Sequence, residues 1–362
     1  MSKLISKLLC IGALIFSGLC SASALPTLKA TFLMEHEGFL LWYAKQQGWD
    51  EKLGFNLDLT ILKSNGIEIL KEYRRDPYSM DITCMSSIPF IMGTKDIDLD
   101  VISIANDESP TTSVLVRNDS DILNVTGYDQ FFPDIYGSPE TVKDKTFAVK
   151  GVSSGAYTLA QWLEHFHLDF NNIKLVSIND TNIVKSITEN KYDGAALWSP
   201  DVLDAQKNGY KIVATAQQMN EIIPCMIMAT QDAVQDKPEL VAKALAIYLK
   251  AVSLQIKDPK ALVSEYKRFY DTIGDSKVTE EFCLDDLKGH IVFPLEEQLK
   301  MFSTEGNRRS HIQKMEKEIT GKTLLILRTM ESKDIQVSHR ISSQKYINNR
   351  FIQMAEKYYN EL

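Results

Sequence analysis

Two serines in the stretch "TFAVKGVSSGAYTLAQWLEHFH" stand where the chain could hold a small polar molecule. Ser153 and Ser154 lie between a short apolar run and an amphipathic stretch of helical period. Either serine could cap that helix, and the free backbone N–H groups of its first turn would then suit an anion. One helix N-terminus contributes only about 0.3 to 1 kcal/mol, whereas micromolar affinity requires about 8 kcal/mol. We therefore expect Ser153, Ser154 and Gly155 to share a ligand with groups from another part of the chain.

Further polar residues follow apolar runs nearer the N-terminus. They come after "LKATFL", "DITCM" and "LDVISIAN", and comprise Glu37, Gly38, Ser86, Ser87, Glu108 and Ser109. Serine hydroxyls suit oxyanions or amides, while Glu37 and Glu108 would suit a ligand ammonium or a ring N–H. An amino-sulfonate or an amine-bearing heterocycle would use both kinds of group. The alternative for both glutamates is a solvated surface carboxylate.

Aromatic side chains extend this predicted set. Trp198 ends the apolar run "DGAALW", and Tyr157 lies in the first turn of the helix after Ser154. An aromatic ring beside a ligand could stack on a flat ring or cover a cation. We therefore add Trp198 and Tyr157 to the expected ligand-binding residues.

Alternating strands and helices must position these residues. The order strand, helix, strand, helix, strand runs from "LKATFLME" to "MDITCMSS" and recurs from "TFAVKG" to "DGAALWSP". Such alternation predicts parallel sheets with helices on both faces. A chain of 362 residues also exceeds the usual limit for one hydrophobic core, so two α/β lobes are expected. Ligands of such sheets lie beyond the carboxyl ends of the strands, which would face one shared cleft.

Three segments carry a resemblance to a known family. They are "YAKQQGWDEKLGFNLDL", "KTFAVKGVSSGAYTLAQWL" and "NKYDGAALWSPDV". With them the chain resembles, over about residues 29–272, the substrate-binding proteins of ABC importers, nearest to the group that binds nitrate, taurine, alkanesulfonates and pyrimidine precursors of thiamine. The resemblance implies a two-lobed periplasmic-binding-protein fold of type II that closes on a small molecule and delivers it to the transmembrane permease.

The resemblance also implies boundaries. The first lobe would comprise residues 25–116 and 222–276, the second lobe residues 117–221, and a helical region at 277–362 would pack against the first lobe. Two crossing strands, near "VLVRNDS" and "VATAQQMNEIIP", would form the hinge.

The N-terminus has the pattern of a secretory signal. Two lysines precede an apolar run, and Ala22-Ser23-Ala24 follows it, so cleavage is expected after Ala24 and the mature protein in the periplasm. A lipid anchor on Cys20 is the less favoured alternative, because Leu19 stands where a small residue is usual. Cleavage leaves 38 basic and 48 acidic residues, a net charge of −10, which argues against a nucleic-acid partner. We expect a monomer.

Cysteines and histidines give no clear metal or cofactor motif. Cys84 and Cys225 could pair if the fold brings them together, and the alternative is buried apolar thiols. His165 and His167 would point about 200° apart on a helix, so they could not share a metal. "GVSSGA" lacks a full dinucleotide fingerprint and a P-loop lysine. We therefore expect no metal and no cofactor.

Two other function classes use the same fold. One is an enzyme like the pyrimidine-precursor synthases, which carry a cysteine-rich motif where this chain offers only Cys84. No catalytic constellation is evident in the sequence, so we expect a binding protein. The other is an exported subunit that presents its ligand to a sensor instead of a permease.

Overall fold

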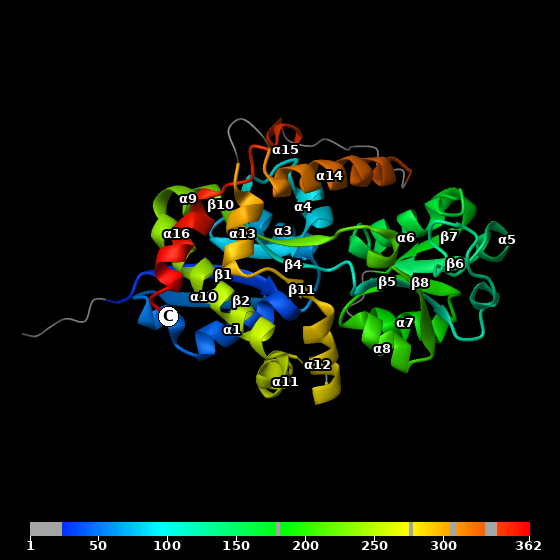
Figure 1. Cartoon of the computed structure of the whole chain (residues 1–362), viewed down its shortest axis with the longest axis horizontal. Helices are drawn as coiled ribbons and strands as arrows, with labels where there is room; N and C mark the ends of the chain where they lie inside the picture. The colour runs from blue at the N-terminus through cyan, green and yellow to red at the C-terminus, as the bar shows by residue number, and fades with distance from the viewer. Residues whose placement is uncertain (1–23, 179–181, 275–277, 305–308, 330–338) are drawn as a thin grey trace, which may run out of the picture.

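The computed structural model describes residues 24–178, 182–274, 278–304, 309–329 and 339–362, and these form two α/β lobes (Figure 1). The predicted two-lobed α/β fold is thus confirmed. The predicted signal segment and Cys20 lie outside the described residues, and so does the cleavage site apart from Ala24.

The first lobe is built on a six-stranded sheet with the order β11-β4-β10-β3-β1-β2. Its strands are β1 (Thr27–Leu33), β2 (Asn56–Leu62), β3 (Ile82–Ser86), β4 (Leu99–Asp107), β10 (Pro224–Thr230) and β11 (Ile291–Val292). β1 pairs in parallel with β2 and β3, as predicted, whereas β10 lies antiparallel between β3 and β4. The predicted parallel pairing therefore holds for β1, β2 and β3, and β10 adds an antiparallel strand that the alternating pattern did not include. β10 returns from the second lobe, so it enters the sheet from the opposite end.

The second lobe has a five-stranded sheet with the order β7-β6-β8-β5-β9. Its strands are β5 (Thr112–Arg117), β6 (Thr146–Val149), β7 (Lys174–Ser177), β8 (Gly194–Trp198) and β9 (Tyr210–Thr215). β6 pairs in parallel with β7 and β8, and β5 is antiparallel to β8 and β9. Its helices are η1 (Asp121–Asn124), α5 (Pro139–Val142), α6 (Ser154–Glu164), η2 (Phe170–Asn172), α7 (Ile183–Asn190), α8 (Asp201–Lys207) and η3 (Gln217–Met219).

Two short segments join the lobes. Because β5 lies in the second sheet, the first crossing falls at residues 108–111, upstream of the boundary predicted after residue 116. The second crossing lies between β9 and β10, close to the predicted boundary at 221/222. A hydrogen bond links the two crossing segments: the Oδ1 of Asp107, at the end of β4, accepts the backbone N–H of Ile223 at 3.0 Å. The backbone N–H of Glu108 also donates to the carbonyl of Ile223, at 2.9 Å.

Helices cover both faces of the first sheet, which explains why β3 and β4 are buried along their whole length. They are α1 (His36–Gln46), α2 (Trp49–Lys52), α3 (Gly66–Arg75), α4 (Ser87–Gly93), α9 (Gln231–Asp236), α10 (Pro238–Lys257), η4 (Pro259–Leu262) and α11 (Val263–Ile273). α1 ends at Gln46, and Gly48 follows with a φ of 67°, a left-handed conformation that glycine adopts without strain. The core of this lobe is a different cluster from the two apolar clusters centred on the second lobe, one of which also includes Ile88 of α4 and Ile326 of α14 (His311–Thr329).

The C-terminal part is helical, and most of it packs on the first lobe. Its elements are α12 (Glu280–Gly289), α13 (Leu295–Phe302), α14 (His311–Thr329), α15 (His339–Ser343) and α16 (Arg350–Tyr359). α16 packs against α10 and β4, whereas α14 contacts both α4 of the first lobe and α6 of the second (Figure 1). Lys322 of α14 binds the carboxylate of Glu221 in the second crossing segment, at 2.6 and 2.8 Å. The C-terminal region therefore also braces the hinge.

Glu316 places a buried carboxyl group between α14 and α4. Ser87 donates its hydroxyl to Glu316 at 2.8 Å, and burial raises the Glu316 pKa to about 7. A carboxyl whose pKa is raised on folding stabilises the fold below its unfolded value, near 4.5, and that stabilisation is lost as the pH rises through about 7. A shift of this size corresponds to roughly 3 kcal/mol.

We predict that Glu316→Gln raises the free energy of unfolding by roughly 3 kcal/mol at about pH 8.5 and changes it little at about pH 4.5, because the amide stays neutral. Urea unfolding at the two pH values measures this. Glu318→Gln, on the same helix but 71% exposed, is the control and should have a small effect at both. An equal effect of Glu316→Gln at both pH values would contradict the account.

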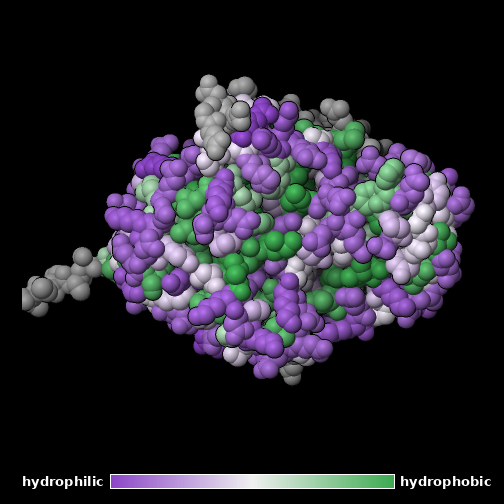
Figure 2. Space-filling model, in the orientation of Figure 1, coloured by the Kyte–Doolittle hydropathy of each residue, from purple (hydrophilic) through white to green (hydrophobic). Residues whose placement is uncertain are grey.

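Within the described residues no helix is both long and apolar enough to cross a membrane. The face of the molecule in Figure 2 is mainly hydrophilic, and hydrophobic residues gather in patches near the boundary between the lobes.

Candidate ligand-binding site

A small cavity lies between the two lobes, at the ends of β1, β3, β6 and β8. Its volume is about 30 Å³, room for little more than a single water molecule. The lining residues are Leu33, Glu35, Glu37, Asn65, Gly66, Ile67, Cys84, Met85, Ser86, Pro89, Glu108, Val152, Ser153, Ser154, Trp198 and Cys225. Both lobes contribute, as the two-lobed prediction requires, and an organic solute can enter only if the lobes separate.

Three glutamates, two from the first lobe and one from the first crossing segment, meet at this cavity. Glu35 and Glu37 follow β1, Glu108 follows β4, and one carboxylate oxygen of each lies within 4.8 Å of the others. Glu37 and Glu108 are only 3% and 4% exposed. Glu37 Oε1 and Glu108 Oε2 have no hydrogen-bond partner among the described residues. Two buried carboxylates with free acceptor capacity are therefore available to a ligand.

The electrostatics of the cluster are unfavourable without a cation. Burial raises the pKa of Glu35 and of Glu108 well above the ordinary value, and repulsion from Glu37 adds to both shifts. No Lys, Arg or His is among the described residues that line the cavity. A positively charged ligand would remove this repulsion and favour the ionised carboxylates.

The lysine beside Trp198 is already paired. Lys150, after β6, forms an ion pair with Asp201, and its ammonium lies 5.0 Å from the centre of the Trp198 ring. On the other side of Trp198, the indole Nε1–H donates to Glu35 Oε1 at 2.9 Å. This hydrogen bond joins the second lobe directly to the first across the cavity.

Two helix N-termini also face the cavity. Ser153 caps α6, since its hydroxyl accepts the N–H of Ala156 at 3.3 Å, and Asn65 caps α3 by accepting the N–H of Ile67 at 3.0 Å. Ser153 is thus the cap, of the two serines considered from the sequence. Helix ends of this kind contribute about 0.3 to 1 kcal/mol toward an anion, which is small beside three carboxylates.

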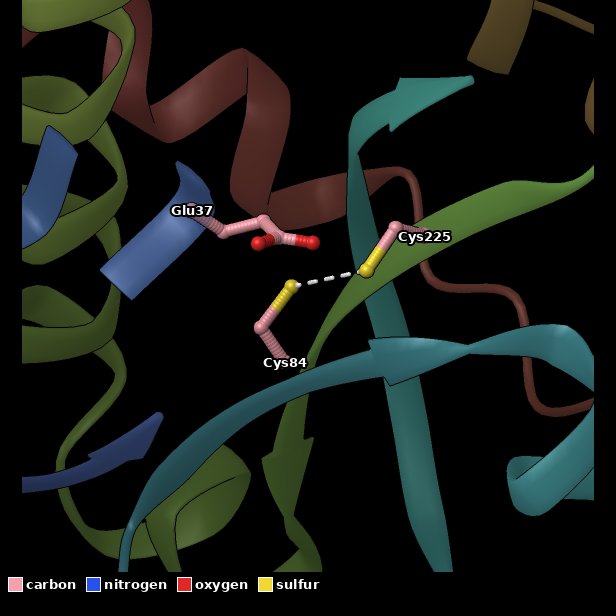
Figure 3. Close-up of side chains that lie close together, drawn as sticks. All are labelled: Glu37, Cys84 and Cys225. Atoms are coloured by element: carbon pink, nitrogen blue, oxygen red, sulfur yellow. Dashed lines mark hydrogen bonds between the residues drawn. The ribbon is translucent and has the colours of Figure 1, made fainter. Parts of the chain in front are cut away.

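Two thiols form one wall of the cavity. Cys84 on β3 and Cys225 on β10 are buried and free, with their sulfur atoms 3.6 Å apart (Figure 3). The carboxylate of Glu37 points toward the two sulfur atoms. Burial raises the pKa of the Cys84 thiol to about 12, so the protein alone does not present a reactive thiolate at neutral pH.

The structure divides the predicted ligand-binding residues into two groups. Those that line the cavity are Glu37, Ser86, Glu108, Ser153, Ser154 and Trp198. Those that do not line it are Gly38, Ser87, Ser109, Gly155 and Tyr157.

Each residue of the second group has another role. Ser87 binds Glu316, and the Ser109 hydroxyl donates to Asp107 at 2.9 Å. The Tyr157 hydroxyl donates to Glu221 at 2.6 Å. The two glycines permit close packing, because a Cβ at Gly38 or Gly155 would lie 2.0 or 2.4 Å from a backbone carbonyl oxygen.

Several cavity residues were not predicted from the sequence. Glu35 is one of them. It stands next to His36 and Glu37, shortly after an apolar strand, and this position is the feature of the sequence that could have identified it. Cys84 and Cys225 lie 141 residues apart, and β10 brings them together by inserting beside β3. Nothing local in the sequence indicates that insertion.

The histidines do not take part in the cavity. His36 points into the first lobe, where its ring stacks on His290 at 4.2 Å and its Nε2 binds Gln255 at 2.7 Å. His165 directly follows α6, which ends at Glu164, and its Nδ1 binds Asp129 at 2.8 Å. In the described parts of the chain, the groups of three residues suited to a metal contain only glutamates and cysteines.

We predict that Trp198→Phe weakens solute binding by roughly 5- to 150-fold. Phenylalanine keeps an aromatic ring at this position but lacks the indole N–H, so Glu35 Oε1 loses its donor in the closed form. An unpaired buried acceptor costs about 1 to 3 kcal/mol. Calorimetry with the solute that stabilises the wild type measures the effect, and Trp49→Phe, away from the cavity, is the control. Equal affinities of both variants and the wild type would show that the bond does not hold the lobes together.

Comparisons with known proteins agree with this architecture. Residues 134–262 match the family model described as NMT1/THI5 like. A protein of Brachyspira hyodysenteriae named as an ABC transporter periplasmic binding protein is 24% identical over 310 residues, covering 83% of this chain and 87% of that protein. The predicted resemblance to the substrate-binding proteins of ABC importers is thus confirmed.

Solved structures share the fold at low identity. The aliphatic sulphonate binding protein SsuA of Escherichia coli has a TM-score of 0.65 at 14% identity, covering 87% of this chain and 91% of that one. The nitrate-binding protein NrtA of Synechocystis PCC 6803 has a TM-score of 0.64 at 13% identity, covering 93% and 89%. At these identities the likeness extends to the fold and not to the ligand.

Proposed function

We propose that this chain, which has the periplasmic-binding-protein fold and an NMT1/THI5-like segment, is the solute-binding subunit of an ABC importer and closes its lobes on a small amine-bearing molecule. The observation that carries the proposal is the cluster of Glu35, Glu37 and Glu108 in an inter-lobe cavity whose described lining has no basic residue. In the periplasm such a subunit would pass its solute to the permease.

The charge of the cavity separates the predicted ligand classes. Nitrate and simple alkanesulfonates are anions that the ionised form of this cluster repels, whereas a cation favours that ionised form. Glu37 and Glu108 can accept hydrogen bonds from an ammonium or amino group, and Trp198 offers a ring face or edge to a flat heterocycle. Among the predicted ligands, an amine-bearing pyrimidine of the thiamine-precursor type therefore fits best. Taurine, with both an ammonium and a sulfonate, is a weaker candidate.

Closure supplies the mechanism. A ligand shifts an open–closed equilibrium only if it binds the closed form more tightly. In this structure Glu37 comes from the first lobe and Glu108 from the crossing segment that follows β4, while Ser153, Ser154 and Trp198 come from the second lobe. A solute held by both sets makes all its contacts only when the lobes come together around it, so the permease can distinguish the occupied form from the open one.

An enzymatic function is not favoured. The two thiols in the cavity are the candidate nucleophiles, but burial raises the pKa of both, and no histidine lines the described cavity wall to deprotonate them.

Thermal-shift screening of the mature protein tests the proposal. The panel contains an aminopyrimidine precursor of thiamine, taurine, an alkanesulfonate without an amine, and nitrate. A ligand at 100 times its dissociation constant adds about 2.7 kcal/mol of stability, which raises the melting temperature measurably. We expect the aminopyrimidine to give the largest rise. A rise with nitrate or the alkanesulfonate alone would refute the proposed ligand class.

A further inference from the structure

We propose that Cys84, Cys225 and Glu37 form a binding site for a thiophilic divalent cation, with zinc as the reference ion, in the wall of the inter-lobe cavity. The inference goes beyond the proposed function, and the site that it describes shares Glu37 with the proposed solute site. It departs from the expectation, drawn from the sequence, that the chain binds no metal.

The distances suit tetrahedral zinc. Two Zn–S bonds of about 2.3 Å at the tetrahedral angle place their sulfur atoms about 3.8 Å apart. Cys84 Sγ and Cys225 Sγ are 3.6 Å apart. A ligand oxygen of Glu37 lies within 4.8 Å of both sulfurs, so a small side-chain movement brings all three to bonding distance of one ion. Figure 3 shows the three side chains converging from α1, β3 and β10.

The three side chains are buried, and one oxygen of Glu37 lacks a hydrogen-bond partner within the part of the chain that the structure describes, which supports a bound cation between them. Cys84, Cys225 and Glu37 are 3%, 2% and 3% exposed, and Glu37 Oε1 has no hydrogen-bond partner among the described residues. A buried carboxylate beside two thiols is costly unless a cation or donor compensates it. Two thiolates and one carboxylate carry enough negative charge to neutralise a divalent ion, and thiolate ligands select zinc over magnesium or calcium.

The scaffold holds the two thiols in place. β10 pairs antiparallel with β3, with Ile227 opposite Cys84 and Cys225 opposite Ser86, so the sheet fixes both thiol positions before any ion binds. Three protein ligands leave one position open on tetrahedral zinc. Glu35 and Glu108, whose carboxylates lie within 4.8 Å of that of Glu37, line the same cavity.

Metal binding to the full mature chain tests the inference. The protein is reduced with a phosphine, freed of metal, and titrated with Zn²⁺ under native mass spectrometry, and separately with Co²⁺ under absorption spectroscopy. We expect one Zn²⁺ per chain and, with Co²⁺, a sulfur-to-metal charge-transfer band. Wild-type protein without zinc uptake, or with a Co²⁺ spectrum lacking that band, would overturn the proposal.

Variants assign the ligands. Loss of even an outer-shell partner weakens a metal site roughly 10- to 100-fold, so Cys84→Ser, Cys225→Ser and Glu37→Gln should each weaken zinc binding by more than about 100-fold. Cys283→Ser is the matched control, because Cys283 is also a buried free cysteine but lies on α12 outside the cluster. Zinc affinity unchanged in Cys84→Ser, or lost equally in Cys283→Ser, would contradict the assignment. If a variant does not fold, the charge-transfer band in the cobalt spectrum of the wild-type protein still shows whether sulfur atoms bind the metal.

The outcomes also separate this inference from the proposed function. If the protein binds zinc but the aminopyrimidine does not stabilise it, the metal site is supported and the proposed organic ligand is refuted. Stabilisation by the aminopyrimidine without zinc binding would do the reverse.

Discussion

Glu37→Gln weakens binding of the aminopyrimidine by roughly 30-fold to more than 1,000-fold. Removing one member of a buried charged hydrogen-bond pair costs about 2 to 5 kcal/mol, and Glu37 is 3% exposed with an oxygen free to accept from the ligand. The variant should fold at least as well as the wild type, because it removes one of three mutually repelling carboxylates.

Isothermal calorimetry measures this change. Glu296→Gln is the matched control, since Glu296 lies on α13 with an 84% exposed side chain and its loss should leave affinity unchanged. Wild-type affinity in a folded Glu37→Gln protein would place the ligand's amine elsewhere.

Trp162→Ala should unfold the second lobe selectively. Trp162 is fully buried in α6, packs edge-on against Phe147 and Phe166 at 5.5 and 5.2 Å, and donates its indole N–H to the carbonyl of Tyr136 at 3.0 Å. Truncating a buried tryptophan costs about 3 to 5 kcal/mol. Because the main cores of the lobes are separate clusters, most of that loss should stay within the second lobe.

Hydrogen exchange followed by mass spectrometry locates the loss. In Trp162→Ala, amides of β5 to β9 should lose protection by more than about 100-fold while those of β1 to β3 keep it. Phe32→Ala, which truncates a buried ring of β1 in the first lobe, should give the opposite pattern. An equal loss of protection in both lobes for both variants would indicate one cooperative body.

Local patterns predicted the elements and part of the site. The apolar run, the serine cap and the amphipathic stretch around Ser153 specify a strand, a turn and a helix within about twenty residues. The rule that ligands lie beyond strand ends then selected Glu37, Ser86, Glu108 and Trp198, all of which line the cavity. These features depend on short-range geometry and on strand direction, which the sequence encodes directly.

The remaining features depend on contacts between distant segments. Ser87 follows a strand as Ser86 does, yet α14 returns from the C-terminal region and places Glu316 against it. Tyr157 is bound by Glu221 of the second crossing segment. The thiol pair exists only because β10 inserts antiparallel beside β3. Periodicity reports the type of an element but not its neighbours, so these contacts could not be predicted from one sequence.

The absence of a basic residue from the described cavity wall could not be predicted either. Lys150 follows β6 and precedes the cavity residue Ser153 by three positions, but its ammonium group pairs with Asp201 and does not line the cavity. Serine-rich turns alone suggested an anion as readily as an amine. The structure brings Glu35, Glu37 and Glu108 together, and this cluster of acidic side chains favours a cationic ligand.

Small-angle X-ray scattering during a ligand titration tests the central claim most directly. The account predicts that the mature protein contracts, with a smaller radius of gyration, when the aminopyrimidine is added, and that nitrate and a simple alkanesulfonate leave it unchanged. Contraction with either anion, and none with the aminopyrimidine, would contradict the claim that the lobes close on a cationic solute.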